Sequence, residues 1–580
     1  MGGLLIKGGT VIDGTGAPRF AADVRVAGGD IVEIGPDLPS RSGERLFDAA
    51  GCLVTPGFIE SHTHYDGVMW WQPDLDPLPG YGATTIVIGN CGFGTAPVSD
   101  DATVREEMAK IFSFFEDMPL RPFLDRLPWD WRSWPEYWRA ASERVRGPLN
   151  VAAYVGHIPL RLATMGMEAW ERAATPDEIA AMAGLLDEAM QAGALGLSTN
   201  LGDYDIQFRP VPSLKADDAE FEALFDVLAR HRQATVQIAL DVFITKTAPE
   251  QVERMSRLVG SRPIRVQMAG GVPVRKFQEG LRDRMVAQHE AHAAAGRDFW
   301  AGYEHTAHTF TLGLWKTLVF GQSNIMPWQE VVNLETEAEK RAMLADPAWR
   351  ARARAVWGAY LETGNPPLAE PETLLLANSD NDHGPVGISL RRYADESGLH
   401  VSDALATWFL DNGIDSLIEI PPMPLDEELM VRLFRDPRSV GNLTDSGAHS
   451  QMLCGAGENM HLLAHLARDR GLIGIEEAVH IMTGKLAGHF FLADRGVIAP
   501  GKRADIAVFR LDEIQKRPLR KARDVPNGDG SFTWRWTRDP APMRLTLVNG
   551  VPTFEAGAQT DATPGEYLRP TPPPLLAAAE

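Results

Sequence analysis

The chain has 580 residues, of which 44% are hydrophobic and 23% charged, and its formal net charge is −22. A chain of this length and composition can bury several cores, which excludes a small disulfide scaffold and a mainly disordered protein. The negative charge repels phosphate backbones and anionic lipid surfaces, so neither nucleic acid nor a membrane is expected as a partner.

The cysteine usage favours a reducing compartment. Cys52, Cys91 and Cys454 are too few, and odd in number, for a disulfide framework. The first residues lack the charged and apolar regions of an export signal, and no run of about 18 apolar residues occurs. We therefore expect a cytoplasmic protein, and a homo-oligomer stays open.

Both ends of the chain read as short strands separated by glycine turns. Residues 4–54 carry such runs, and a similar pattern returns between 495 and 551. We expect these ends to pair into one small β-sandwich domain, made from 1–54 and 496–560. The Pro-rich tail at 561–580 is expected to be poorly ordered or laid over the surface.

Between the ends, eight short apolar runs alternate with helical stretches. This is the spacing of parallel strands joined by crossover helices, and eight is the strand number of a TIM-like (β/α)8 barrel. We therefore predict an α/β fold with such a barrel over 55–495. The predicted strands are Leu53–Glu60, Thr84–Gly89, Val151–Gly156, Ala194–Ser198, Ala234–Asp241, Ile264–Met268, Phe299–Tyr303 and Val440–Asp445.

Two features between the strands stand out. Thr175, Pro176 and Glu178 occupy the N-cap, first and third positions of a predicted helix that runs to Ala192. The segment 304–438 is too long for a single crossover, so it is expected to be a largely helical insertion after the seventh strand.

The strongest chemical signal is the pair His62 and His64 at the end of the first predicted strand. Residues i and i+2 of an extended segment share a face, and the carboxyl end of a barrel strand faces the mouth of the site. Two neutral imidazoles converging there are half of a zinc shell. The alternative is a pair of unrelated polar histidines in a loop.

The chain resembles the amidohydrolase superfamily through Pro-Gly-Phe-Ile-Glu-Ser-His-Thr-His at 56–64 and Gly-Val-Ile-Ala-Pro-Gly-Lys-Arg-Ala-Asp-Ile-Ala-Val at 496–508. It is similar, more specifically, to the N-acyl-D-amino-acid deacylase (D-aminoacylase-like) branch. That likeness lies in Gly-Ala-Thr-Thr-Ile-Val-Ile-Gly-Asn-Cys-Gly-Phe-Gly at 82–94 and Thr-Asp-Ser-Gly-Ala-His at 444–449.

This resemblance implies several site residues. Cys91 would be a thiolate metal ligand, which zinc accepts beside imidazole nitrogen. Asp445 would bind metal and carry the proton from the attacking water to the leaving nitrogen. His449 would contact substrate. Cys91 as an inert core thiol and Asp445 as a turn cap are the alternatives.

One departure from the branch concerns the fifth and sixth strands, where the resemblance implies a histidine at the end of each. This chain has Gln237 to Asp241 and Val266 to Ala269 there instead. Replacement ligands would come from Asp241, or from His305 and His308, whose spacing could place them on one helical face. Solvent-facing polar residues are the alternative for these histidines.

Further candidates line the end of the third predicted strand. His157 could polarise a carbonyl, and Arg161 could bind a substrate carboxylate in a fork, unless both are held in buried ion pairs. Tryptophans are dense between Trp129 and Trp138, with Trp70 and Trp71 nearby. They would line an apolar pocket or pack in the core.

Together these features predict a zinc-dependent amidohydrolase holding one or two Zn²⁺ ions. It would cleave a linear amide of a small molecule, most simply an N-acyl (D-)amino acid. Metal-activated water would attack the carbonyl, with Asp445 as base and His157 as a second donor to the oxyanion. A formamide or cyclic amide substrate on the same scaffold, and a metal-poor relative that binds a small ligand, stay open.

Overall fold

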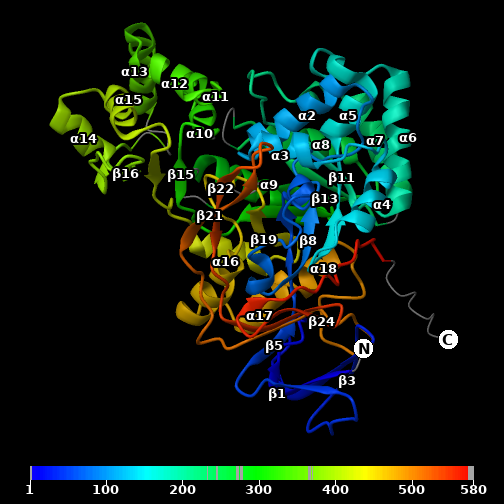
Figure 1. Ribbon diagram of the computed structural model, residues 1–580. Coiled ribbons are helices and arrows are strands. Elements are labelled where there is room, and N and C mark those ends of the chain that lie inside the picture. The colour runs from blue at the N-terminus through cyan, green and yellow to red at the C-terminus, as the bar shows by residue number, and fades with distance from the viewer. Residues whose placement is uncertain are drawn as a thin grey trace.

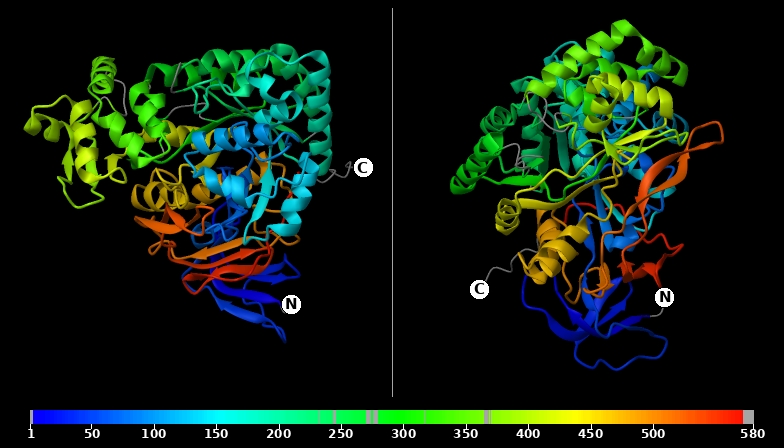
Figure 2. Two further views of the ribbon diagram at one scale, coloured as in Figure 1. Left: turned by 45° about the horizontal axis from the view of Figure 1, so that its top comes forward. Right: turned by 90° about the vertical axis from the view of Figure 1, so that its left-hand side faces the viewer.

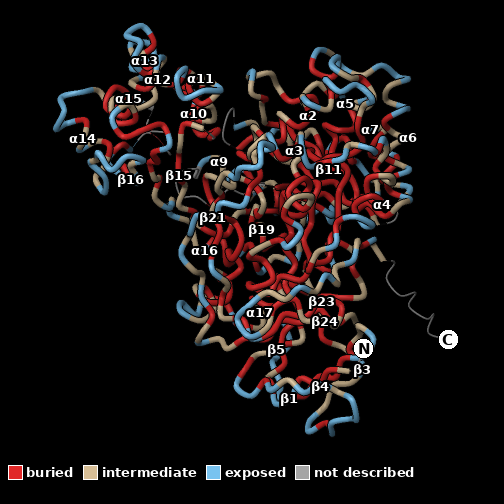
Figure 3. The backbone as a smooth tube through the Cα atoms, viewed as in Figure 1, coloured by how far each residue is buried: buried red, intermediate tan, exposed pale blue. Residues whose placement is uncertain are grey.

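The computed structural model describes residues 3–571 except 232, 243–245, 270–273, 275–278, 316, 364–367 and 369. A strand-and-helix barrel forms the centre, a sheet built from the chain ends lies at its base, and a mainly helical lobe projects from one side (Figures 1 and 2). Buried backbone runs continuously through the barrel and into the sheet below it (Figure 3). Among the described residues, no helix has both the length and the apolar character needed to cross a membrane.

The two ends of the chain meet in one nine-stranded sheet of order β25-β24-β23-β20-β5-β1-β2-β3, with β4 paired to β1. The central pairing joins β5 to β20 antiparallel, which brings Val54 opposite Val508. The strands are β1 Leu4–Val11, β2 Phe20–Ala27, β3 Asp30–Gly35, β4 Arg45–Asp48, β5 Leu53–Pro56, β20 Ile506–Phe509, β23 Met543–Val548, β24 Val551–Glu555 and β25 Ala558–Gln559.

Eight extended segments form a closed ring of parallel pairs, as predicted. The first segment pairs with the second through β6 and with the eighth through β7, and the third segment pairs on both sides through β9 and β10. The barrel strands are β6 Phe58–Glu60 with β7 His62–Thr63, β8 Ala83–Ile88, β9 Asn150–Ala153 with β10 Val155–Gly156, β11 Gly196–Asn200, β12 Thr235–Ala239, β13 Arg265–Ala269, β14 Phe299–Glu304 and β19 Ser439–Ser446.

The first predicted strand was too long at its start. Leu53–Pro56 belongs to the terminal sheet, and the barrel strand begins at Phe58. Gly57 lies between them, and its N–H donates to the Asp505 carbonyl at 2.9 Å. A Cβ at Gly57 would lie 2.0 Å from the side chain of Thr84. Glycine therefore lets the chain pass from one sheet into the other.

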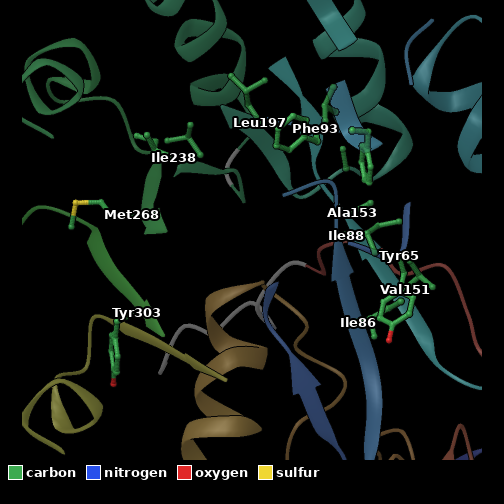
Figure 4. Close-up of a cluster of buried hydrophobic side chains, with 14 of the residues drawn as sticks. Tyr65, Ile86, Ile88, Phe93, Val151, Ala153, Leu197, Ile238, Met268 and Tyr303 are labelled. Carbon is green, nitrogen blue, oxygen red and sulfur yellow. The ribbon is translucent and has the colours of Figure 1, made fainter. Parts of the chain in front are cut away.

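Alternate residues of the barrel strands face different cores, because successive strand side chains point to opposite faces. Ile88, Ile238 and Met268 belong to the large cluster that includes the surrounding helices (Figure 4). Val87 and Val440 belong to a separate cluster with Phe490. By this parity Gln237 and Gln267, the neighbours of Ile238 and Met268, face the barrel interior.

Helices surround the barrel between successive strands. They are α1 Tyr65–Val68, α2 Ala102–Phe115, α3 Leu120–Arg126, α4 Trp134–Arg144, α5 His157–Met165, α6 Pro176–Ala192, α7 Asp218–Arg230, α8 Ala248–Val259, α9 Glu279–Ala294, α16 Glu427–Arg435, α17 Ile475–Met482 and α18 Gly484–His489, with a π-helical segment at His461–Asp469. The predicted helix after Thr175 is confirmed as α6, which has a capping box.

The lobe at the side is the predicted insertion after the seventh strand, with its own core. Four of its tryptophans are buried there, Trp328, Trp349, Trp357 and Trp408. Its helices are α10 Val319–Gln322, α11 Met326–Asn333, α12 Glu337–Ala345, α13 Pro347–Thr363, α14 Leu390–Ser397 and α15 Val401–Asn412. A small antiparallel sheet that was not predicted joins β15 Phe310–Leu312, β16 Leu375–Asn378, β17 Ile388–Ser389 and β18 Leu417–Ile420.

A hairpin and the C-terminal segment complete the structure. The hairpin of β21 Leu519–Pro526 and β22 Phe532–Arg538 extends upward along the barrel (Figure 1). Trp536 N–H donates to the Ser450 carbonyl at 2.7 Å. Part of the predicted tail lies over the surface, where Leu568 N–H donates to the Val151 carbonyl at 2.7 Å. The rest of the tail is outside the described residues.

The capping box of α6 gives a stability prediction. Thr175 Oγ1 accepts from the Glu178 N–H, so Thr175→Ala should destabilise the first turn by about 1 kcal/mol. The loss should appear as faster hydrogen exchange of the amides at 177–179. Exchange is measured because it reports the stability of this one helix, whereas the chain has several cores. Thr175→Ser keeps the hydroxyl and should exchange as the wild type does. Unchanged exchange in the alanine variant would contradict the capping argument.

Candidate metal centre

His62 and His64 lie at the carboxyl end of the first barrel strand, and their Nε2 atoms face one another at 3.2 Å. His62 begins the short strand β7, and His64 is the N-cap residue of α1. Both side chains are almost completely buried. The i, i+2 spacing therefore does bring both imidazoles to one point, as predicted.

Cys91 and Asp445 approach the same point from the neighbouring strands. Cys91 Sγ lies 3.3 Å from His62 Nε2. Asp445 Oδ1 lies 3.1 Å from His64 Nε2 and 3.7 Å from His62 Nε2. Strands two, one and eight are adjacent in the ring, so four donor atoms predicted from distant parts of the sequence converge at one side of the barrel mouth.

This donor set fits a metal ion. The donor atoms of His62, His64 and Cys91 lie within 4.8 Å of one another, and so do those of His64, Glu116 and Asp445. Imidazole nitrogen, thiolate and carboxylate are the ligands that zinc accepts. A cation between them would satisfy lone pairs that otherwise face one another.

The two histidines differ in charge without a metal. Burial, reinforced by His64, lowers the pKa of His62 to about 3 and keeps its ring neutral. Burial also opposes a charge on His64, but the carboxylates of Glu116 and Asp445 outweigh it and raise its pKa to about 9. A bound cation would replace the His64 proton, because a ligating imidazole must be neutral.

Asp445 connects this donor group to His449. Its Oδ1 faces the two ligand histidines, whereas Oδ2 lies 3.4 Å from His449 Nε2. Burial acts against the carboxylate, but His449 and His64 hold the pKa of Asp445 well below its usual value. Asp445 and Asp117 in turn raise the pKa of His449 well above its usual value, against the effect of burial. The result is a partly exposed ion pair beside the donor group, with the Asp445 side chain 30% exposed.

Three of these residues have left-handed backbone conformations. The φ angles are 55° at Cys91, 58° at Asp445 and 51° at His449. Non-glycine residues rarely adopt this region, and such outliers gather at functional sites where the surrounding fold enforces them. The local backbone therefore turns each strand end so that its side chain points toward the shared centre.

Sequence reasoning missed Glu116 and Asp117, which follow α2. Glu116 Oε1 lies 3.1 Å from His64 Nδ1, and Asp117 Oδ2 lies 3.4 Å from His449 Nδ1. Both carboxylates are buried. Burial, above the opposing effect of His64, raises the pKa of Glu116 to about 8. Two adjacent acids at a helix end were the one available signal, and they are common on surfaces.

His157 and Arg161 are placed differently from their predicted roles. His157 Nε2 lies 2.7 Å from Glu220 Oε1, and its Nδ1 lies 2.9 Å from Thr199 Oγ1. The Arg161 guanidinium pairs with the other oxygen of Glu220, and all three side chains are completely buried. With both ring nitrogens occupied and the guanidinium enclosed, this triad matches the alternative of buried ion pairs, and it offers neither an oxyanion donor nor a carboxylate fork.

Gln237 and Gln267 stand on the fifth and sixth strands, where the resemblance implies histidines at the strand ends. Gln237 Oε1 accepts from the Cys91 N–H at 2.9 Å. Gln267 Oε1 accepts from the Tyr154 hydroxyl at 3.2 Å and from His489 Nε2 at 2.9 Å. These amides therefore bind protein groups inside the barrel, and Gln237 supports the backbone of Cys91.

The candidate replacement ligands do not join the convergent donors. Asp241, His305 and His308 belong to neither of the convergent donor groups found in the described part of the chain. His305 is completely buried beside the ring of Phe434. His308 lies between two carboxylates, with Nε2 3.1 Å from Glu304 Oε1 and Nδ1 3.5 Å from Glu458 Oε1. The observed additional carboxylate is instead Glu116.

The tryptophans divide between core and cleft. Trp131, Trp134 and Trp138 are buried and belong to the large core. Trp71 and Trp536 line a cleft together with Tyr65, Met118 and Ala448, residues that adjoin His64, Asp117 and His449 in sequence. This cleft offers apolar surface next to the elements that carry the donor group.

Comparison with known proteins agrees with this architecture. The amidohydrolase family matches residues 45–335 and 432–554, so the chain belongs to that family. The unmatched residues between these ranges fall mainly in the side lobe.

Individual relatives are more specific. D-aminoacylase of Alcaligenes xylosoxydans xylosoxydans is 28% identical over 98% of this chain and 98% of its own length. N-acyl-D-glutamate deacylase of the same organism is 28% identical over 98% of this chain and 96% of its own. Among solved structures, a D-aminoacylase is 25% identical with a TM-score of 0.66, covering 98% of this chain and 99% of that one.

The His308 contacts give a pH prediction. Burial opposes its charge, but Glu458 and Glu304 raise the pKa of His308 to about 9. Because this value exceeds that of the unfolded chain, the stabilisation is complete below about pH 6.5 and is lost as the pH rises through about 9.

We therefore expect His308→Gln to lower the urea midpoint of unfolding more at pH 6 than at pH 10. The exposed His383 supplies a control, since His383→Gln should leave the midpoint unchanged at both pH values. An equal loss at both pH values in His308→Gln would show that packing, not charge, accounts for the contribution of His308.

Proposed function

We propose that the protein is a zinc-dependent hydrolase that releases the amine from N-acyl D-amino acids or similar small linear amides. The observation that carries this proposal is the convergence of His62, His64, Cys91 and Asp445 at the mouth of an amidohydrolase barrel. The substrate class is supported by the relatives named D-aminoacylase and N-acyl-D-glutamate deacylase.

The four donors would hold the ion, and zinc bound there supplies a Lewis acid that activates water and polarises a carbonyl. Asp445 is the base in this proposal. It is ionised at neutral pH, and as a carboxylate beside the ion it would accept a proton from water and return it to the departing amine. His449 faces the second oxygen of Asp445 through Nε2 and Asp117 through Nδ1, so it would orient the base. Contact between His449 and the substrate stays a prediction.

The cleft beside His64 would take the apolar part of the substrate. Its lining is mainly aromatic and aliphatic, and the charged residues Arg535 and Asp76 in it are paired at 3.1 Å, so it suits an acyl chain or an apolar side chain. A formamide or cyclic amide could occupy the same space, so substrate choice rests on the relatives rather than on the cleft.

A reducing location belongs to the proposal. Cys52, Cys91 and Cys454 are all free, and Cys91 must stay unoxidised to bind zinc. A cytoplasmic enzyme would meet that requirement.

Metal content after dialysis tests the centre. We expect about one tightly held zinc per chain in the wild type, with a strong loss in both His62→Ala and Cys91→Ala, because each removes a donor from the same group. Cys52→Ala removes a distant thiol and should keep the wild-type content. A wild type that holds no metal after reconstitution would favour a ligand-binding relative instead.

Hydrolysis assays test the reaction. The zinc-loaded protein is offered N-acetyl-D- and N-acetyl-L-amino acids, N-formyl amines and hydantoins, and released amine or ring opening is measured. We expect turnover of the D-acyl substrates, reduced by about 10²- to 10⁴-fold in Asp445→Asn when the two proteins are compared at equal zinc occupancy. Preference for the cyclic substrates would replace the deacylase assignment. Full turnover by Asp445→Asn would refute Asp445 as the base.

A further inference from the structure

The end of α2 presents two consecutive carboxylates to two different histidines of the centre. The side chains of Glu116 and Asp117 are 1% and 2% exposed. Glu116 Oε1 lies 3.1 Å from Nδ1 of His64, the nitrogen that faces away from Asp445, and its Oε2 lies 4.0 Å from Nε2 of His449. Asp117 Oδ2 lies 3.4 Å from Nδ1 of His449. In both histidines Nε2 faces Asp445, and Nδ1 faces a carboxylate from the end of α2.

Asp117, at the end of α2, has a sterically unfavourable backbone conformation that lets the two carboxylates point in different directions. Met118 N–H donates to the Ser113 carbonyl at 3.0 Å, which closes the helix end, and Asp117 takes a φ of 47°. Glycine is the usual residue at such a left-handed helix terminus. An aspartate there turns the chain so that neighbouring side chains point to separate targets.

The loop that carries His449 is attached to the same helix end. The His449 N–H donates to the Glu116 carbonyl at 2.5 Å. Helix α2 therefore contacts the end of the first strand through the Glu116 side chain and the loop after the eighth strand through the Glu116 backbone. This joins the two strand ends that supply His64 and Asp445.

We infer that Glu116 and Asp117 are positioning residues with separate tasks, Glu116 for metal affinity through His64 and Asp117 for catalysis through His449. A carboxylate 3.1 Å from Nδ1 favours the tautomer with its proton on that nitrogen, which leaves the Nε2 lone pair for the metal. Asp117 holds His449 against Asp445 in the same way. The inference rests on the proposed metal-dependent function.

A competing role for Glu116 is direct binding of a second ion. Its carboxylate forms a convergent group with His64 and Asp445. The two roles differ in measurable ways, because loss of a ligand to a second ion lowers the number of ions bound, whereas loss of a positioning residue lowers the affinity of the same number.

The experiment measures zinc affinity by competition with a chromogenic chelator, and zinc number by elemental analysis, on the full chain. The variants are Glu116→Ala, Glu116→Gln and Asp117→Asn, with folding checked by circular dichroism. We expect affinity to fall by about 100-fold in Glu116→Ala and about tenfold in the isosteric Glu116→Gln, at unchanged zinc number.

Asp117→Asn is the matched comparison, since it removes one buried carboxylate from the same helix end and asparagine tolerates the left-handed conformation. We expect it to keep the wild-type zinc affinity while kcat falls and its pH profile shifts. The absorption spectrum of the cobalt-substituted protein should change in Glu116→Gln and stay the same in Asp117→Asn.

Each other outcome decides against the inference. Wild-type zinc affinity in both Glu116 variants would remove the role of Glu116, and equal weakening in Asp117→Asn would show a general effect of buried charge. Loss of one of two ions would make Glu116 a ligand. A wild type that holds zinc but hydrolyses no amide would overturn the proposed function alone, because the affinity comparison does not depend on turnover.

Discussion

Buried negative charge at one side of the barrel mouth is the constraint on which the site depends. Glu116 and Asp117 are enclosed and Asp445 is partly exposed, and all three lie within a few ångströms of two histidines. Enclosing carboxylates in protein is costly unless cations or protons accompany them. Protons on His64 and His449 provide part of that charge, and a metal ion would provide more. Strand ends, helix α2 and the left-handed turns all serve to hold this group together.

The donor atoms of the centre are distributed unevenly around the barrel. Its donors come from the first, second and eighth strands and from one helix end, whereas the fifth and sixth strands contribute amides. An amide is a weak ligand for zinc but a good partner for backbone and hydroxyl groups. Gln237 and Gln267 thus form internal hydrogen bonds, Gln237 to the backbone of the donor Cys91.

The fold followed from the sequence where the signal was local. Strands buried on both faces are continuous apolar runs, so eight of them could be located, and two histidines two residues apart share a face in any extended segment. The partner of Arg161 could not be located in this way, because Glu220 lies 59 residues further along the chain. Glu116 meets His64 only through the packing of α2. The sheet of the side lobe has strands of two to four residues, too short to show alternation.

The terminal sheet has a consequence for synthesis of the chain. Strand β5 lies between β1 and β20, and its Thr55 contacts Ala507, 452 residues further on. At about 5 to 20 residues per second, the ribosome needs about 20 to 90 seconds to deliver that partner. During this interval β5 has an unpaired edge that another extended chain can occupy. The nascent protein is therefore most exposed to aggregation before its last strands emerge. The yield of folded protein should depend more on chaperone supply during translation than on the stability of the finished fold.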